Sequence, residues 1–358
     1  MQHGGRVASA FRVSPRLADR LPPALVTNQT ARPTTTSQPP VRVAEDGQRG
    51  RVPLPIMVEA GARMAFGYAR NMYGLRDKRP PGRFLARSWK FLVSAREQRH
   101  VLAEMSGLRV LVPTADRTIA RSVYSSGDWD PLLVGTAFDA LRAFGHDYQG
   151  TVFLEVGANF GVYSLPAVAE FGFARAIAYE PDPHAYALLA ENIERNGLRA
   201  RVSAHHAALS GAAGELTLSL GAGNAGDNRV VADDAHSGRA TVRVAARTFD
   251  DEVRSGNIPL DELGLVWLDV QGHEAAVLDG AASLLSSGVP VVMEYATALL
   301  DHDARRRLDE LIISNFDVFV DLGWCALTNR LRFQPISAIA RLGRGRLALE
   351  TDLLLLHG

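Results

Sequence analysis

The chain has very little cysteine and lysine: among its 358 residues the one cysteine is Cys325, and the only lysines are Lys78 and Lys90. A single cysteine excludes an internal disulfide and any metal site built from several cysteines. We therefore expect a cytoplasmic, reducing compartment. No apolar run approaches the ~20 residues that a membrane-spanning helix needs, so we expect no membrane span.

Charge of either sign is not in excess, because 39 basic residues balance 39 acidic ones. A net charge of zero provides no overall field that would attract nucleic acid, so we expect no nucleic-acid partner. Hydrophobic content of 47% and charged content of 22% are ordinary for a globular protein. The length allows one large domain or two smaller ones with ample core.

The chain divides into three parts by composition. Residues 1–52 are rich in Pro, Thr, Gln, Arg and Ala, and such a segment cannot bury enough apolar surface to offset its ordering entropy. We therefore expect a disordered tail there. The alternative is a targeting peptide, suggested by the first arginines but disfavoured because no apolar h-region follows them. Residues 53–150 are predicted to form a helical and hairpin cap, and residues 151–358 the main domain.

Within the cap, the 3.6-residue apolar period and the breaks at Pro and Gly predict three helices and one hairpin. The helices are expected at 54–72, 84–105 and 131–144, and the hairpin strands at 108–112 and 118–124. The second helix mixes apolar and basic residues, a pattern that suits a membrane surface or a partner. Packing on its own domain is the interpretation that we favour.

From residue 151 onward, short apolar runs alternate with helical patterns, which predicts an α/β fold with a mostly parallel sheet covered on both faces. The final two strands are expected to be an antiparallel edge pair. The predicted strands are 152–156, 175–179, 201–206, 215–220, 240–245, 263–270, 289–294, 316–320 and 352–357. The predicted helices are 162–170, 184–196 and 274–285.

A glycine-rich turn follows the first of these strands. Glu155, Gly157, Asn159 and Gly161 form the pattern E-x-G-x-N-x-G between an apolar run and a helix. Glycines at a strand-to-helix turn let the backbone double back and let a ligand approach it closely. The turn alone is weak evidence for a nucleotide-type site.

Acidic residues recur at the predicted strand ends. Glu155, Glu180, Asp269 and Glu294 all fall there, at the edge of an open α/β sheet where ligands bind. Glu180 lies 25 residues after Glu155 (180 minus 155), a suitable place for an acid that accepts hydrogen bonds from a ribose diol. The alternative for Glu180 is an acid in a surface turn.

Four segments together resemble the FkbM-type family of S-adenosylmethionine-dependent methyltransferases. They are VFLEVGANFGVYS (152–164), AYEPDPHAYALLAENIERNG (178–197), VWLDVQGHEAAVLDGA (266–281) and PVVMEY (290–295), and they occur in the family's order and spacing. The segment VAARTFDDE (244–252) also resembles the family. The resemblance implies a Rossmann-like class I methyltransferase fold that binds S-adenosylmethionine.

The resemblance also implies which residues hold that cofactor. Glu155 would face the methionine amino end, Glu180 would hold the ribose hydroxyls, and Pro181 or Asp182 would border the adenine. Ala207 and its neighbour Ala208 would approach the adenine edge. The full set of implied cofactor residues is Glu155, Gly157, Ala158, Asn159, Gly161, Tyr163, Ser164, Glu180, Pro181, Asp182, Ala207 and Asp269.

At the reacting end, residues 269–274 match the family segment D-V-E-G-H-E, except that Gln271 replaces the usual Glu. His273 is the predicted base, since imidazole titrates near neutral pH, and Asp269 would orient it or touch the substrate. A purely structural role is the alternative for His273. Gln271 and Glu294 are predicted to contact the substrate, and no metal is expected.

The predicted function is therefore that of a methyltransferase (EC 2.1.1 class), with O-methylation of a hydroxyl on a small natural product, sugar or glycan favoured. Two alternatives stay open. One is a non-catalytic module that binds S-adenosylmethionine, which the change at Gln271 keeps in play. The other is a nicotinamide-dependent dehydrogenase, although the turn lacks a full G-x-G-x-x-G and no Tyr-x-x-x-Lys pair is present. The sequence does not indicate an oligomeric state.

Overall fold

The computed structural model describes residues 81–221, 225–231, 239–296, 299–300, 302–342 and 350–358. The expected tail (1–52) and the expected helix at 54–72 lie outside the described residues. The predicted boundary between cap and main domain stays a prediction. No helix in the described part of the chain is long and apolar enough to cross a bilayer.

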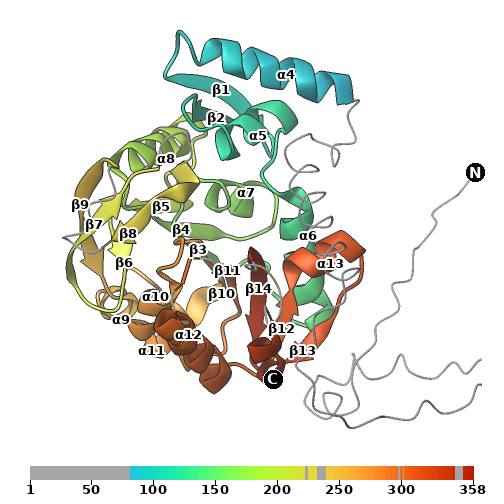
Figure 1. Cartoon of the computed structure of the whole chain (residues 1–358), viewed down its shortest axis with the longest axis vertical. Coiled ribbons are helices and arrows are strands. Elements are labelled where there is room, and N and C mark those ends of the chain that lie inside the picture. The colour runs from blue at the N-terminus through green and yellow to red at the C-terminus, as the bar shows by residue number, and fades with distance from the viewer. Residues whose placement is uncertain (1–80, 222–224, 232–238, 297–298, 301, 343–349) are drawn as a thin grey trace, which may run out of the picture.

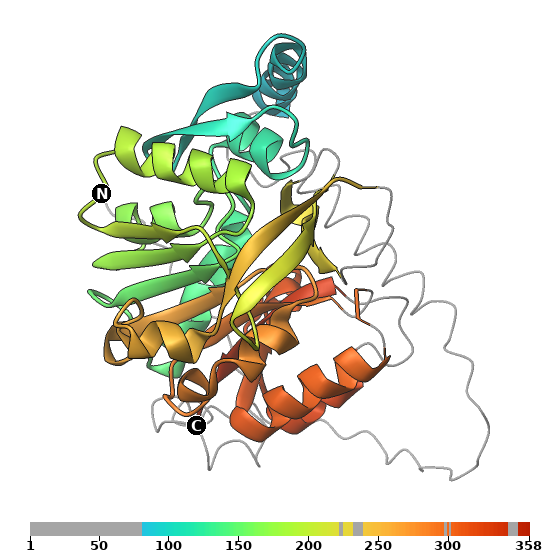
Figure 2. The same ribbon diagram turned by 90° about the vertical axis from the view of Figure 1, so that its left-hand side faces the viewer.

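The centre of the molecule is an eight-stranded sheet of order β13-β12-β14-β11-β10-β3-β4-β5 (Figures 1 and 2). From β11 to β5 all neighbours are parallel, whereas β14 runs antiparallel to both β11 and β12. The predicted Rossmann-like α/β fold, mostly parallel with an antiparallel final strand, is confirmed. The strands are β3 (Val152–Val156), β4 (Arg175–Tyr179), β5 (Val202–His205), β10 (Leu263–Leu268), β11 (Val291–Ala296), β12 (Val318–Asp321), β13 (Phe333–Pro335) and β14 (Glu350–Leu356).

The two predicted final strands, β12 and β14, pair antiparallel as expected, but they do not form the edge of the sheet. β14 lies inside the sheet between β11 and β12, and the short β13 forms that edge. Leu353, Leu354 and Leu355 of β14 are fully buried, as a strand covered on both faces requires. An uninterrupted run of leucines was the sequence signal for this inner position.

Helices cover both faces of the sheet, because successive β3 side chains point to opposite sides. Phe153 belongs to one core and Leu154 to the other. The first core contains residues of α6 (Pro131–Phe144), α7 (Ser164–Ala169), α8 (Pro183–Arg195) and α13 (Leu322–Thr328). The second contains residues of α9 (Phe249–Arg254), α10 (Glu274–Asp279), α11 (Ala282–Leu285) and α12 (His302–Asn315).

The helix predicted at 274–285 is two helices, α10 and α11. At Gly280 a side chain would come within 2.2 Å of the Ser210 carbonyl oxygen, so the chain there packs directly against another backbone segment. Asp250 accepts hydrogen bonds from the backbone N–H groups of Ala282 and Ser283 and so begins the second helix.

The cap differs from its prediction at two elements. α4 (Pro81–Ser94) ends early, and the hairpin consists of β1 (His100–Met105) and β2 (Leu108–Pro113), joined by Ser106 and Gly107, both with positive φ. The predicted strand at 118–124 is instead α5 (Ile119–Ser126), since Ile119, Ala120 and Val123 are buried at helical spacing.

The cap is tied to the main domain by α8. The side chain of Asn192 accepts a hydrogen bond from the Leu111 backbone N–H and donates one to its carbonyl oxygen. Asn196 makes the same pair of bonds with Arg109. The two asparagine side chains bond to the backbone of β2 in the way that a neighbouring strand would. These bonds hold the hairpin against α8 (Figure 1).

A second, four-stranded sheet of order β6-β9-β7-β8 lies beside the main one (Figure 2). Its strands are β6 (Ala208–Leu209), β7 (Gly214–Ser219), β8 (Arg229–Val231) and β9 (Thr241–Arg247). β7 and β9 pair antiparallel, which confirms the predicted hairpin, whereas β8 was not predicted. Each residue of β8 is half-buried, so the strand lacks the alternation of buried and exposed residues that a sequence pattern could reveal.

Candidate active site

The site lies where the strand order reverses, between β3 and β10. The Asp269 backbone N–H donates to the Val156 carbonyl oxygen over 2.9 Å, so the two strand ends are in contact. Gly157 follows β3 with φ +91°, and a Cβ there would lie 1.9 Å from the Asp269 carbonyl oxygen. Only glycine fits this position.

Glu155 is buried at the end of β3, with 1% of its surface exposed. Its carboxylate accepts hydrogen bonds from the backbone N–H groups of Tyr163 (3.1 Å) and Ser164 (2.7 Å), which begin α7. Burial raises the pKa of Glu155 to about 8 although these donors favour the charged form. The carboxylate therefore closes the glycine turn and also lines the pocket.

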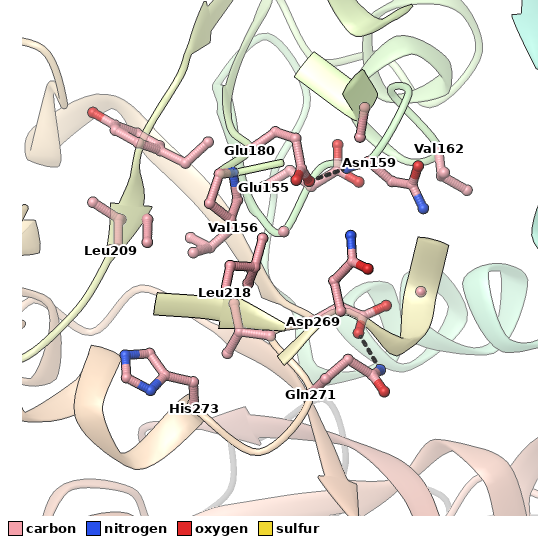
Figure 3. A pocket seen from close by; sticks show the side chains of 18 of the residues that line it. Glu155, Val156, Asn159, Val162, Glu180, Leu209, Leu218, Asp269, Gln271 and His273 are labelled. Atoms are coloured by element: carbon pink, nitrogen blue, oxygen red, sulfur yellow. Dashed lines mark hydrogen bonds between the residues drawn. The ribbon is translucent and has the colours of Figure 1, made fainter. Parts of the chain in front are cut away.

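Glu180 is held in the same manner at the end of β4 (Figure 3). One oxygen accepts from the Asn159 backbone N–H (2.6 Å) and the other from the Asp182 backbone N–H (2.7 Å). Burial raises its pKa to about 8. Because each carboxylate oxygen has two lone pairs, both oxygens keep an acceptor site for a ligand.

These strand ends line a pocket whose empty space, with its open mouth included, is about 770 Å³ (Figure 3). Most of the predicted cofactor residues line it. They are Glu155, Gly157, Asn159, Tyr163, Glu180, Pro181, Ala207, Ala208 and Asp269.

Four predicted cofactor residues do not line this pocket. Ala158 and Ser164 are buried in the turn and α7, and at Gly161 a Cβ would lie 2.7 Å from the Leu165 side chain. Asp182 begins α8 by accepting from the His184 backbone N–H, and it lines a neighbouring pocket. All four lie around the pocket wall, and their direct contact with cofactor stays a prediction.

Asn159 shows that the pocket is built for a polar ligand. Only 8% of its surface is exposed, and its backbone is left-handed, with a φ of +50°. Among the described residues, its side-chain oxygen has no hydrogen-bond partner. A buried orphan acceptor needs a donor, and a nucleoside bearing hydroxyl and amino groups offers one. The donors and acceptors present therefore fit S-adenosylmethionine.

Several lining residues were missed from the sequence. Leu218 lies in β7 and Val230 in β8, whereas Gly226 and Asn228 lie between these two strands. The sequence leaves two roles open for the polar residues around Asn228, closing over the substrate or simple solvation. The Asn228 side chain donates to the Asp182 carboxylate (2.9 Å) and accepts from the Gly221 backbone N–H (2.8 Å). No local sequence pattern predicts that this segment contacts the residue that begins α8. Ile119 and Trp129 come from the cap, and an isolated tryptophan before a helix was the only signal.

A second cavity adjoins the first. The two share six lining residues, Ile119, Trp129, Tyr163, Gly226, Asp269 and Gln271. Glu294 lines only the second cavity, whereas His273 lines only the first. The predicted substrate residues Gln271 and Glu294 are thus together in the second cavity, and Asp269 stands at the junction.

Gln271 links two acidic side chains at that junction. Its amide nitrogen donates to Asp269 (2.9 Å) and to Glu294 (3.0 Å). Burial raises the pKa of Asp269, and burial together with Asp269 raises that of Glu294 to about 10. A glutamate at position 271 would offer no N–H donors, so the departure from the family pattern supplies both bonds.

His273 begins α10 and lies apart from Asp269 and Gln271 (Figure 3). Its Nε2 is 3.0 Å from the Ser210 hydroxyl oxygen, and burial lowers its pKa. Burial therefore favours the neutral form of the imidazole, which is the form that a base needs. Its assignment as the catalytic base stays a prediction.

Sequence comparison relates the domain to known methyltransferases. Methyltransferase sdnD of Sordaria araneosa is 27% identical over 152 residues, which are 36% of this chain and 59% of that protein. Hexuronic acid methyltransferase AglP of Haloferax volcanii is 27% identical over 168 residues, 46% of this chain and 64% of that protein. The chain thus spans about six tenths of the length of each relative.

Solved structures give weaker likenesses. An O-methyltransferase from Bacillus cereus in complex with SAH shows 13% identity and a TM-score of 0.35, covering 64% of this chain and 82% of that one. TYW2 of Pyrococcus horikoshii in complex with MeSAdo shows 14% identity and a TM-score of 0.36, with 73% of each chain covered. TM-scores of this size carry no argument about function.

The family model gives the clearest match. Residues 155–312, which contain the glycine turn, Glu180, Asp269 and Gln271, match the methyltransferase FkbM domain. This stretch of the chain is a FkbM-type domain of the S-adenosylmethionine-dependent methyltransferases.

Proposed function

We propose that this protein transfers a methyl group from S-adenosylmethionine to a hydroxyl of a small natural product, sugar or glycan. The observation that carries the proposal is the junction of the two cavities at Tyr163, Asp269 and Gln271. A cofactor in the first cavity and an acceptor in the second would meet there. Holding two reactants in line supplies much of the rate enhancement in such transfers.

In this proposal the cofactor is held by residues of the first cavity. Glu180 accepts hydrogen bonds from the ribose hydroxyls, and the orphan oxygen of Asn159 takes one further donor. Glu155 lies toward the methionine end and keeps α7 in place. When bound, S-adenosylmethionine supplies a methyl group that is already electrophilic because it is attached to a sulfonium sulfur.

We propose that Asp269 accepts the proton of the acceptor hydroxyl. It lines both cavities, and its raised pKa makes it a stronger base than an ordinary carboxylate. Gln271 holds it at the junction. His273 lines only the cofactor cavity, so we propose that it positions the loop through Ser210.

Two observations support a sugar or another ring-shaped acceptor. Phe84, Trp129 and Tyr163 line the second cavity and present aromatic surface, while most of its other lining residues are polar. One relative is named a hexuronic acid methyltransferase. Both are consistent with an acceptor that has apolar faces and polar edges.

The test uses S-adenosylmethionine and a panel of methyl glycosides and small alcohols, with S-adenosylhomocysteine formation followed by mass spectrometry. We expect acceptor-dependent product that is lost in Asp269→Asn, although this variant still binds the cofactor. Glu180→Ala should lose binding as well as turnover. Cofactor binding without turnover on any acceptor would contradict the proposal and favour a non-catalytic module.

A further inference from the structure

The outer face of helix α4 is apolar although it faces solvent. Leu85 is 55% exposed, Trp89 67% and Val93 41%. These residues follow one another at intervals of four (89 minus 85, 93 minus 89), so they form one line along the helix, which we call the outer stripe.

Exposed apolar side chains gather in this part of the molecule. Leu102 of the adjoining strand β1 is also exposed. Elsewhere in the described ranges, the large apolar side chains that are exposed are Ile313 and Leu327, on two different helices. Single exposed residues are ordinary, whereas apolar residues gathered on one face mark an interaction site.

The opposite face of α4 packs on its own domain. Phe84 and Phe91 are buried, and the Phe91 ring lies 5.5 Å from the ring of Tyr124 in α5. The Arg87 guanidinium donates two hydrogen bonds, of 2.6 and 2.9 Å, to the Tyr124 carbonyl oxygen. The inner face therefore anchors the helix, and the outer stripe is available for a second contact.

Positive charge accompanies the outer stripe. Residues 84–100 contain four basic residues and one acidic residue, a net charge of +3 (4 minus 1) in a chain whose total is zero. Lys90, Arg96 and Arg99 are exposed, and α4 itself contains no acidic residue. In the adjoining hairpin Glu104 lies directly opposite Arg109, so the hairpin adds no net charge. The partner of the stripe should therefore be anionic as well as apolar.

The position of α4 suits a flat partner. The helix lies at one end of the molecule, and the hairpin and α5 separate it from the main sheet (Figures 1 and 2). A flat surface therefore meets the outer stripe before it meets the main domain. A stable protein interface buries about 800 Å² on each partner, and a stripe of three side chains falls well short of that area. These features favour a lipid surface over a second copy of the chain.

We propose that the outer stripe of α4 binds an anionic membrane surface, with the helix lying parallel to it. Leu85 and Val93 enter the boundary of the acyl chains, and the amphipathic indole of Trp89 lies at the level of the headgroups. Lys90 contacts lipid phosphates, and the exposed arginines that follow the helix add electrostatic attraction. Phe84, on the inner face of the same helix, lines the second cavity, so this cavity lies next to the docking surface. The inference concerns a partner and does not depend on the proposed function.

The first test is co-sedimentation of the full chain with vesicles. One set contains phosphatidylcholine alone, and the other contains phosphatidylcholine and phosphatidylserine at about 3:1. We expect at least about tenfold tighter binding to the anionic vesicles, and a large loss of that binding at about 0.5 M salt, which screens the charges. Equal binding to both vesicles, or binding to neither, would overturn the inference.

Variants then identify the surface that binds. The double variant Leu85→Ala, Trp89→Ala should bind anionic vesicles about tenfold more weakly or worse, and Lys90→Ala about fivefold more weakly. The double variant Ile313→Ala, Leu327→Ala removes two exposed apolar side chains elsewhere and should bind as the wild type does. Because all these side chains are exposed, the melting temperature should stay unchanged throughout. An equal loss of binding in the control would contradict the assignment to α4.

Two further measurements test the other possible occupants of the stripe. Sedimentation velocity without vesicles should give the same result for the wild type and for Leu85→Ala, Trp89→Ala. An oligomer that this variant dissociates would show that a second copy covers the stripe.

The emission of Trp89, taken as the difference between the wild type and Trp89→Ala, should be that of a solvated indole. It should shift to shorter wavelength when anionic vesicles are added. A Trp89 emission that is blue-shifted before vesicles are present would show that another part of this chain covers the stripe. Either this outcome or the dissociating oligomer would overturn the inference.

Discussion

The two cavities hold their acidic side chains in different ways. In the cofactor cavity, Glu155 and Glu180 each accept two backbone N–H hydrogen bonds from residues no more than 21 positions away. In the second cavity, Glu294 is held by the Gln271 side chain, while Glu350 and Asp352 have no hydrogen-bond or ion-pair partner for their side chains in the described residues.

The two kinds of hydrogen-bond donor, backbone in the first cavity and side chain in the second, differ in how easily they can change. Backbone donors are fixed by the fold, so the first cavity is preorganised for one invariant ligand before that ligand arrives. The acidic side chains of the second cavity have few backbone donors, so single substitutions there change the lining without disturbing a turn of the main chain. Under the proposed function, the comparison separates a fixed cofactor site from an adaptable acceptor site.

The largest effect should come from breaking the contact on which both cavities depend. Gly157→Ala would force a Cβ into the Asp269 carbonyl oxygen at a φ that alanine rarely adopts. We expect a loss of about 3 kcal/mol or more in the free energy of unfolding, measured by urea denaturation. Gly135→Ala, in open space on α6, is the control and should stabilise by up to about 1 kcal/mol. A Gly157→Ala variant as stable as the wild type would contradict the contact between the strand ends.

A second substitution tests the hydrogen bonds that link Asp269 and Glu294. Gln271→Glu restores the usual family residue but removes both hydrogen bonds to Asp269 and Glu294. At pH 8 we expect a loss of about 1–3 kcal/mol in the free energy of unfolding, with little change in affinity for S-adenosylhomocysteine. The loss should be smaller at pH 5.5, because the carboxyl group introduced at position 271 takes up a proton more readily there and can then donate a hydrogen bond. If Gln271→Glu were as stable as the wild type at both pH values, the two hydrogen bonds of Gln271 would have no role in stability.

The pH dependence of stability should sharpen the comparison. The pKa values of Glu155 and Glu180 rise to about 8 on folding, from the ordinary value near 4.5. A raised carboxyl pKa contributes stability below the unfolded value, and this stability is lost as pH rises through the folded value. The melting temperature of the ligand-free protein should therefore fall between pH 5 and 8.5, measured by calorimetry.

Glu180→Gln should make that fall shallower, because one of the shifted groups is then absent. Saturating S-adenosylhomocysteine should do the same if ribose hydroxyls donate to Glu180. A melting temperature that rises over this range would show that the two carboxyl groups ionise normally in the folded protein.

The smallest effect is expected at His273. His273→Ala removes the contact with Ser210 and should change the dissociation constant of S-adenosylhomocysteine by less than about threefold. Turnover, once an acceptor is known, should fall further in Asp269→Asn than in His273→Ala. The reverse order would restore His273 as the base.

The comparison also explains which parts were predictable from sequence. Glu155 and Glu180 are held by residues no more than 21 positions away, so their spacing predicted the cavity that they line. The positions of Glu350 and Asp352 at the second cavity depend on the insertion of β14 between β11 and β12, which no local pattern shows. The contact between Asn228 and Asp182 was not predicted for the same reason, since the two residues are 46 positions apart.

One error in the fold came from a local helix start that the apolar pattern did not reveal. The strand predicted at 118–124 is α5, because Asp116 accepts from the backbone N–H groups of Thr118 and Ile119 and starts a helix. The parallel strands β3, β4 and β10 were predicted well, since burial on both faces leaves a continuous apolar run.

The most direct test of the account is calorimetric titration with S-adenosylmethionine, S-adenosylhomocysteine and NAD. We expect micromolar binding of the first two ligands and no binding of NAD. Glu180→Ala should weaken binding about 30-fold or more, the cost of leaving ribose hydroxyls unpaired, whereas Asp352→Asn in the second cavity should leave the affinity unchanged. Binding of NAD, or equal losses in the two variants, would contradict the division of the site into a cofactor cavity and an acceptor cavity.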